Sequence, residues 1–214
     1  MDVFRPGGLE LTKKAIYALG LEPGAKVLDI GCGLGATLSF LSEQFSADVY
    51  GVDSSPAAVK KAGERLGKER VLCADAVCLP FADDSFQLVL MECVLNLIPE
   101  PEKALQEACR VLAPGGGIVI SGLTAPDCDR LCHQGRMDVS ALRRALNTLN
   151  MYDINVSDET AILRRFVAEI IFEYDSIENY LAHADAKLGG SVLCCNMPMK
   201  GTGYALVTAK KAKV

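Results

Sequence analysis

The strongest constraint in this sequence is an alternation of short apolar runs with longer amphipathic ones. Runs of strand length lie at residues 26–30, 47–52, 70–74, 86–92 and 117–123, and segments of helical period lie at 9–19, 35–44, 54–67 and 101–112. Repeated strand-then-helix units predict a doubly wound, mostly parallel sheet with helices on both faces. Ligands of such sheets bind at the carboxyl ends of the strands. The alternation therefore predicts an α/β fold and the edge of the sheet that holds a site.

The chain after residue 123 is less regular. We expect a helix at 140–150, a strand at 151–157, a helix at 160–184 and a last strand at 203–211, with residues 126–137 and 185–202 as loops or a cap facing the substrate. A length of 214 residues suffices for one well-cored domain but hardly for two. We predict a single domain with a leader at 1–23, a cofactor-binding core at 24–122, a substrate cap at 123–202 and a last strand with its tail at 203–214.

A glycine-rich turn follows the first predicted strand, in the stretch VLDIGCGLGA at residues 27–36. Gly31, Gly33 and Ala36 satisfy the dinucleotide pattern G-x-G-x-x-G/A, so the glycines alone do not identify the ligand. Acidic side chains stand at or just beyond four consecutive strand ends: Asp29, Asp53, Asp75 and Glu92. A pyrophosphate normally meets a positive helix N-terminus after an apolar strand, and these carboxylates would repel it. The acidic residues therefore argue against a nicotinamide dinucleotide.

S-adenosylmethionine suits this arrangement better, because it has a ribose diol, an ammonium group and a sulfonium charge but no phosphate. We expect Asp53, 20 residues after the second glycine, to hold both ribose hydroxyls. Asp75 and the amide of Ala76 would hold the adenine edge, and Asp29 would act on the methionine ammonium directly or through water. Glu92 either lines the site or simply ends a strand. The predicted cofactor-binding residues are Asp29, Gly31, Cys32, Gly33, Gly35, Asp53, Ser54, Asp75, Ala76, Glu92 and Cys93.

These residues resemble the class I S-adenosylmethionine-dependent methyltransferases, in the type 11 branch that acts on small molecules. The matching segments follow one another between residues 24 and 122 and are VLDIGCGLG, VYGVDSSPAAVKKA, CADAVCLPFADDSFQLVLMECVLNLI and EACRVLAPGGGIVISG. The first segment alone is weak evidence, but the ordered set is specific. The resemblance implies a Rossmann-like, seven-stranded sheet whose last strand, GYALVTAKK, is antiparallel. We expect a helical cap before that strand and methyl transfer to a small molecule.

The sequence departs from the family at one position that bears on the chemistry. Many small-molecule members have a histidine a few residues after the fourth strand, whereas this chain has Asn96 there. Displacement at a sulfonium methyl has a good leaving group, so an already nucleophilic acceptor needs only desolvation and alignment. The missing base points to such an acceptor, and the catalytic side chains stay unassigned.

Nine cysteines, an odd number in a chain too large to need a disulfide framework, indicate free thiols. Five of them lie in or beside apolar segments, where a thiol fills space: Cys32, Cys73, Cys78, Cys93 and Cys109. The candidate catalytic residues are the other four, Cys128, Cys132, Cys194 and Cys195, which would present a soft acceptor such as a thiol, a selenide or arsenite. Incidental loop cysteines are the alternative. His133 and His183 have no partner at metal-ligand spacing, so we predict no metal site.

Composition argues against several kinds of partner. A net charge of −5 with scattered lysine and arginine disfavours nucleic-acid binding. No apolar run is long enough to cross a bilayer, and MDVFRPGGLE lacks the parts of a signal peptide. We expect a cytoplasmic protein with a small-molecule substrate and no nucleic-acid or membrane partner, and the oligomeric state is not predicted. Arg5 in this stretch either reaches the methionine carboxylate or lies in a disordered terminus.

Two other functions stay open. An NAD-type oxidoreductase is disfavoured by Asp29 and Asp75. A non-catalytic sensor or scaffold that binds the cofactor is excluded by nothing in the motifs.

Overall fold

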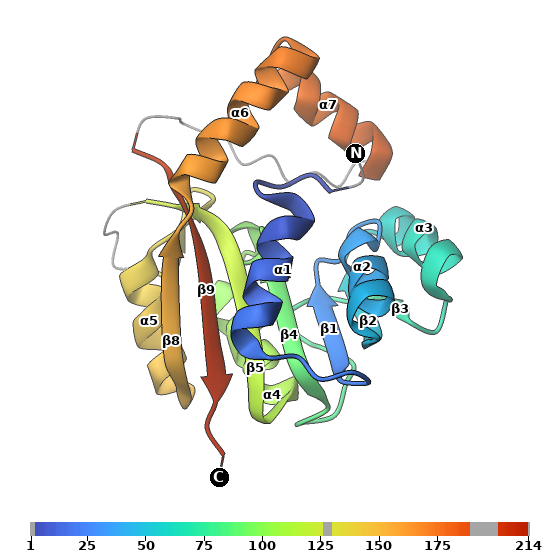
Figure 1. Cartoon of the computed structure of the whole chain (residues 1–214), viewed down its shortest axis with the longest axis vertical. Helices are drawn as coiled ribbons and strands as arrows, with labels where there is room; N and C mark the ends of the chain where they lie inside the picture. Colours follow the sequence, from blue (N-terminus) through green and yellow to red (C-terminus); the bar gives the residue numbers. More distant parts are fainter. Residues whose placement is uncertain (1–2, 126–129, 189–200, 214) are drawn as a thin grey trace.

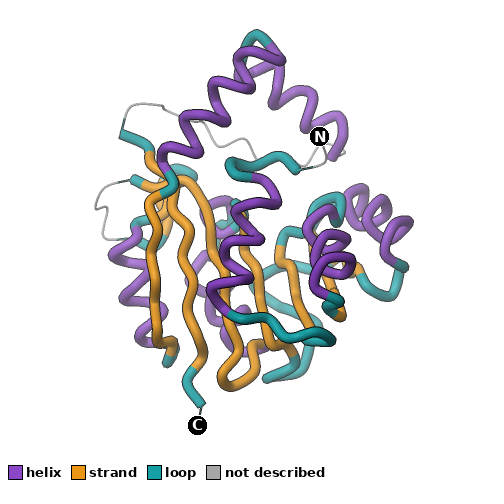
Figure 2. The backbone as a smooth tube through the Cα atoms, viewed as in Figure 1, coloured by secondary structure: helices purple, strands orange, loops and turns teal. Residues whose placement is uncertain are grey.

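A twisted sheet forms the centre of the molecule, with helices on both faces (Figure 1, Figure 2). The computed structural model describes residues 3–125, 130–188 and 201–213. Seven of the strands form the main sheet in the order β3-β2-β1-β4-β5-β9-β8, in which β9 runs antiparallel to both of its neighbours. The other two strands, β6 and β7, have two residues each and form a hairpin that pairs with the end of β5. This is the doubly wound fold that the sequence predicted, with its last strand antiparallel.

The element bounds follow the predicted ones closely. The strands are β1 Lys26–Ile30, β2 Asp48–Asp53, β3 Val71–Cys73, β4 Phe86–Glu92, β5 Leu112–Thr124, β6 Cys132–His133, β7 Arg136–Met137, β8 Met151–Asp158 and β9 Gly203–Lys211. The helices are α1 Gly8–Leu19, α2 Ala36–Phe45, α3 Pro56–Leu66, the 3-10 helix η1 Leu95–Leu97, α4 Pro101–Val111, α5 Val139–Thr148, α6 Thr160–Tyr174 and α7 Ile177–Leu188.

The differences lie mainly in the second half of the chain. The single helix predicted at 160–184 is two helices, because Asp175 between them adopts a left-handed conformation with φ 64°. The segment predicted as a loop at 126–137 contains the β6–β7 hairpin, whose turn residues Gln134 and Gly135 both have positive φ. The fifth strand begins at Leu112 rather than at residue 117.

Side chains of the central strands alternate between two cores on opposite faces of the sheet. Leu28 of β1 and Met91 of β4 join the core that includes α4 and α5. Val27 and Leu90 join the core that includes α1, α2 and α6. Figure 1 shows the same division, with α1 and α2 in front of the sheet and α4 and α5 behind it. The period of two therefore assigns the acidic residues at the ends of β1 and β4 to the face covered by α1.

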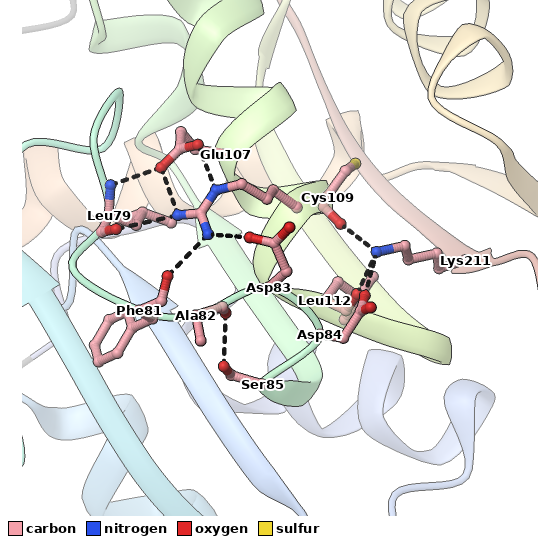
Figure 3. A network of polar contacts seen from close by, with 11 residues as sticks. Leu79, Phe81, Ala82, Asp83, Asp84, Ser85, Glu107, Cys109, Leu112 and Lys211 are labelled. Carbon is pink, nitrogen blue, oxygen red and sulfur yellow. Dashed lines mark hydrogen bonds and ion pairs between the residues drawn. The ribbon is translucent and has the colours of Figure 1, made fainter.

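A polar network fastens the last strand at the end of the sheet where the parallel strands begin (Figure 3). Lys211, at the end of β9, donates from Nζ to the carbonyl oxygens of Cys109 and Leu112 at 2.9 and 2.6 Å and pairs with Asp84 at 2.7 Å. The neighbouring Arg110 donates to two carbonyl groups and pairs with two carboxylates from α4 and the loop before β4. The network joins the last strand to α4 and β5.

Helices α6 and α7 form a hairpin that rises beyond the carboxyl ends of the parallel strands, next to the start of the described chain (Figure 1). Phe166 and Ile170 of α6 pack with Tyr180 of α7, and Phe4 joins that cluster. The predicted helical cap before the last strand is therefore present. No helix in the described part of the chain is long and apolar enough to span a membrane.

Candidate functional site

A cavity of about 400 Å³ lies at the carboxyl ends of the parallel strands. Its floor consists of the turns after β1, β2, β3 and β4. Its roof consists of residues 3–6, which we call the leader segment, together with parts of α6 and α7. The predicted cofactor residues that line this cavity are Gly31, Cys32, Gly33, Asp53, Ser54, Asp75, Ala76, Glu92 and Cys93. Asp29 and Gly35, predicted for the same site, are not on its wall.

The glycine turn brings the main chain close to the end of β4. Gly31 has φ 78°, and a Cβ atom there would lie 2.6 Å from Cγ2 of Val94. The backbone N–H groups of Gly31 and Cys32 both donate to the carbonyl oxygen of Val52, at 2.8 and 3.1 Å. These bonds tie the turn to β2, and only glycine at position 31 permits so close an approach to the opposite wall.

Asp53 ends β2, and two backbone amides hold its carboxylate. Oδ2 accepts from the N–H of Gly33 and Oδ1 accepts from the N–H of Ser55, both at 2.9 Å. Each carboxylate oxygen can accept more than one hydrogen bond, so both keep capacity for the hydroxyl groups of a ligand. Ser55 is also the residue that caps α3, where its Oγ accepts from the N–H of Ala58 at 3.3 Å.

Asp75 and Ala76 follow β3 and extend the acidic floor beyond Asp53. The Asp75 side chain is exposed, and its Oδ1 accepts from the N–H of Val77 at 3.1 Å. The two carboxylates therefore stand on neighbouring strand ends with their orientation set by nearby backbone amides.

Glu92, at the end of β4, is paired with the leader segment. Its Oε2 lies 2.7 Å from Nη2 of Arg5, and its Oε1 accepts from Oγ1 of Thr12 in α1 at 2.9 Å. The side chains of Arg5 and Glu92 are only 11% and 3% exposed. Burial raises the pKa of Glu92, while Arg5 and Thr12 oppose that rise. Glu92 thus both ends a strand and lines the cavity, and Arg5 lies folded over the cavity rather than in a disordered terminus.

Two predicted cofactor residues, Gly35 and Asp29, lie behind the wall of the cavity. Gly35 caps the start of α2 with φ 74°, and a Cβ atom there would lie 2.8 Å from Cδ1 of Leu66 in α3. Asp29 is 4% exposed, because the alternation of β1 directs it to the face that α1 covers. Burial and the nearby Glu92 carboxylate raise the pKa of Asp29 to about 8, against the opposing effect of Arg5. Asp29 therefore lies next to the cavity but not on its wall, and its contact with the methionine ammonium stays a prediction.

Cys93, the next residue along the wall, has a left-handed backbone with φ 57°, which is uncommon for a residue with a side chain. Its Sγ lies 3.0 Å from Oη of Tyr204 in β9, and that hydroxyl donates to Oγ of Ser121 at 3.1 Å. Tyr204 is 1% exposed, and burial raises its pKa well above the ordinary value, so the hydroxyl stays protonated. The wall is thereby joined to the last strand, which no local sequence pattern indicated.

The roof has an aromatic lining that the sequence prediction missed. Phe4, Phe166 and Tyr180 reach the cavity from the leader segment, α6 and α7. The ring centroid of Tyr180 lies 5.7 Å from that of Phe166 and 6.2 Å from that of Phe4. The Tyr180 hydroxyl is buried and has no hydrogen-bond partner among the described residues. In the sequence Phe166 and Tyr180 are indistinguishable from the core face of an amphipathic helix, and Phe4 precedes the first helix.

Of the four candidate catalytic cysteines, the structure describes only Cys132. Cys132 is in β6, where its Sγ lies 3.7 Å from the carbonyl oxygen of Leu95, and it is not on the cavity wall. Cys128, Cys194 and Cys195 lie outside the described residues. Within the described ranges no three His, Cys, Asp or Glu side chains come together in a way that could hold a metal ion.

The fold and the cavity together define a class of protein. A sheet of this order with one antiparallel strand, a glycine turn after β1 and an acidic residue at the end of β2 is the architecture of class I methyltransferases. Residues 28–120 match the model of the family described as "Methyltransferase domain". This match and the fold support a class I S-adenosylmethionine-dependent methyltransferase domain over residues 28–120.

Known proteins resemble the chain over different extents. An arsenite methyltransferase from Halobacterium salinarum is 32% identical over 155 residues, which are 64% of this chain and 40% of that protein. The crystal structure of the cyclase SpnF has a TM-score of 0.73 at 26% identity and covers 96% of this chain and 81% of its own. Phosphoethanolamine N-methyltransferase 2 from Haemonchus contortus, in complex with phosphomonomethylethanolamine and S-adenosylhomocysteine, shares the fold with a TM-score of 0.75 at 22% identity, over 99% of this chain and 55% of its own. The chain spans about half the length of the curated relatives it matches.

Proposed function

We propose that this chain transfers a methyl group from S-adenosylmethionine to a small-molecule acceptor. The observation that supports this best is the gathering of Asp53, Asp75 and Glu92 around the glycine turn in one cavity. An acidic wall suits a cofactor that has a sulfonium cation and no phosphate, and it opposes the binding of a pyrophosphate. The match to the methyltransferase domain supports the same cofactor.

The proposed contacts with the cofactor follow the floor of the cavity. Asp53 holds the ribose hydroxyls, and Asp75 with the amide of Ala76 holds the adenine edge. Arg5 is proposed for the methionine carboxylate, because its Nε is buried without a hydrogen-bond partner among the described residues. Asp29 acts on the methionine ammonium through water, from behind the wall. The remaining proposed wall contacts are Gly31, Cys32, Gly33, Ser54, Glu92 and Cys93.

The chemistry proposed for the wall is alignment and desolvation. Bound S-adenosylmethionine supplies an electrophilic methyl group, which an acceptor attacks in line as S-adenosylhomocysteine leaves. Among the described residues on the wall there is neither histidine nor lysine, and Glu92 is already paired with Arg5. Asn96 is buried away from the wall, where its Nδ2 donates to the carbonyl oxygen of Gly135 at 2.6 Å. The acceptor is therefore one that attacks without a base supplied by these side chains.

A soft acceptor, with a sulfur, selenium or metalloid centre, fits this requirement and is the finer part of the proposal. The resemblance to an arsenite methyltransferase supports it. Changing Cys194 and Cys195 together to Ser should abolish turnover of thiol, selenide or arsenite acceptors and leave S-adenosylhomocysteine binding intact. Cys73→Ser, at an exposed thiol, is the control. Full activity in the double variant would remove the role of these two cysteines.

Calorimetry tests the cofactor. S-adenosylmethionine and S-adenosylhomocysteine should bind, and NAD should not. Asp53→Ala should weaken binding of S-adenosylhomocysteine by about 2–4 kcal/mol, because two charge-assisted hydrogen bonds are lost. Asp83→Ala changes an exposed carboxylate at the opposite end of the sheet and should have no effect on affinity. Binding of NAD without either adenosyl ligand would overturn the proposal.

Cofactor binding and methyl transfer must be tested separately, because SpnF is a cyclase with this fold. Mass spectrometry of soft and hard acceptors incubated with S-adenosylmethionine should find a product heavier by one methyl group. Cofactor binding with no methylated product would favour the non-catalytic alternative. The division into leader, core, cap and last strand, and the cytoplasmic location, stay predictions.

A further inference from the structure

The floor and the roof of the cavity differ in chemistry, and the difference limits what the acceptor can be. Arg5 is the only arginine, lysine or histidine among the described residues on the wall, and Glu92 neutralises it at 2.7 Å. The carboxylates of Asp53 and Asp75 remain on the floor without a cationic side chain on the wall to balance them. Because Glu92 and the methionine carboxylate of the bound cofactor would both occupy Arg5, an anionic acceptor would find no unpaired cation among these side chains.

Apart from Arg5, the side chains of the roof are aromatic or apolar. Phe4, Phe166 and Tyr180 line it, and the edge-to-face packing of Tyr180 on Phe166, at 89°, holds the two rings in place. The Tyr180 hydroxyl is a neutral donor, since burial raises its pKa above the ordinary value. Lys187 has its Nζ 5.8 Å from the centre of the Phe4 ring but is not on the wall. Faces of aromatic rings attract cations and bury apolar groups, and they offer nothing to an anion.

We propose, building on the function proposed above, that the acceptor is an uncharged or cationic molecule with an apolar part, and that the cavity rejects anionic acceptors such as phosphate esters and carboxylates. Bound S-adenosylmethionine does not reverse this preference. Its net charge is a single positive one, whereas Asp53 and Asp75 together carry two negative charges. In this respect the chain would differ from the Haemonchus contortus enzyme, whose structure holds phosphomonomethylethanolamine.

Three probes of equal size separate charge from shape: benzyl alcohol, benzylamine and benzoate. Each is titrated by NMR into the full chain saturated with S-adenosylhomocysteine. Benzyl alcohol and benzylamine should bind, and benzoate should bind at least about 10-fold more weakly at low ionic strength. The gap should narrow in about 0.5 M salt, because screening weakens charge repulsion. Benzoate binding as tightly as benzyl alcohol, or benzyl alcohol failing to bind, would overturn the proposal.

A pair of variants tests whether the floor sets the preference. Asp75→Asn should improve benzoate relative to benzyl alcohol by about 3-fold or more, because it removes one of the two unbalanced charges. Asp83→Asn removes a carboxylate at the other end of the sheet and should leave the ratio unchanged. An unchanged ratio in Asp75→Asn, or the same change in both variants, counts against the proposal. Failure of S-adenosylhomocysteine to bind at all would instead sink the proposed function, so the two failures are distinguishable.

Discussion

At the scale of single residues, the unusual feature is the group of ionisable side chains buried on the α1 face. Asp29 and Glu92 are both nearly inaccessible to solvent. Arg5 is the one cation that lowers the pKa of both carboxyl groups, against the rise caused by burial. One guanidinium does not compensate two buried carboxylates, so one of them is better protonated. The raised pKa of Asp29, about 8, identifies it as that residue near neutral pH.

Asp29 should therefore make stability depend on pH. Its folded-state pKa of about 8 exceeds the ordinary 3.8, so its contribution to stability is fully present below about pH 4 and is lost as the pH rises to 8. Asp29→Asn has a neutral side chain of the same shape that does not titrate, so its contribution to stability does not change with pH. The free energy of unfolding of the variant relative to the natural chain should grow by about 2–4 kcal/mol between pH 5 and pH 8.

Urea unfolding at pH 5, 6.5 and 8 measures this difference. Asp83→Asn is the control, because that carboxylate is 73% exposed. A difference for Asp29→Asn that stays constant with pH would mean that the carboxyl group is already ionised in the folded protein.

At the scale of elements, the leader segment is fastened to the sheet by one buried contact group. Arg5 meets Glu92 at the end of β4 and also donates to Oγ1 of Thr12 in α1 at 2.6 Å. The contact spans 87 positions in the sequence, so it orders the start of the described chain over the cavity. The roof on the leader side therefore depends on a side-chain pair rather than on regular secondary structure.

Glu92→Gln should destabilise the protein by about 3 kcal/mol, because it removes the carboxylate that contacts the buried guanidinium of Arg5. Changing Arg5 and Glu92 together to Met should cost less than the sum of Arg5→Met and Glu92→Met. Denaturant unfolding of the four proteins in this cycle measures the coupling. Additive losses would show that the two side chains do not stabilise one another.

At the scale of the whole molecule, the two ends of the sheet have separate tasks. The carboxyl ends of the parallel strands hold the cavity, while the opposite end holds the polar network of Arg110 and Lys211 (Figure 3). Lys211 donates to two backbone carbonyl groups, one near the end of α4 and one at the start of β5. The network therefore holds the end of β9 against these two elements. Substitutions in this network should therefore change stability without changing ligand binding.

Lys211→Met should lower the free energy of unfolding by about 1–3 kcal/mol, because two carbonyl groups lose a charged donor. Binding of S-adenosylhomocysteine should be unchanged, since the network is at the other end of the sheet. Lys210→Met, on the opposite face of the same strand, is the matched control. A loss of affinity in Lys211→Met with normal stability would contradict this separation.

The sequence by itself determined the fold class and the edge of the sheet that holds the cavity. Strand and helix periods are local properties, so β1 and β4 have the predicted bounds and the order of elements is as expected. The glycine turn at Gly31 and the acid at the end of β2, Asp53, are also local signals, and both are on the cavity wall. Nine of the eleven predicted cofactor residues line the cavity for this reason.

Only the tertiary structure decided what lies beyond the strand ends. Asp29 and Glu92 share the face that α1 covers, but only Glu92 reaches the cavity wall. Gly35 packs on α3 because two helices meet there. The aromatic roof joins Phe4 to Tyr180, residues far apart in the sequence that no periodic pattern connects. Such contacts follow from the packing of whole elements, so a pattern that reports the neighbours of a residue along the chain does not contain them.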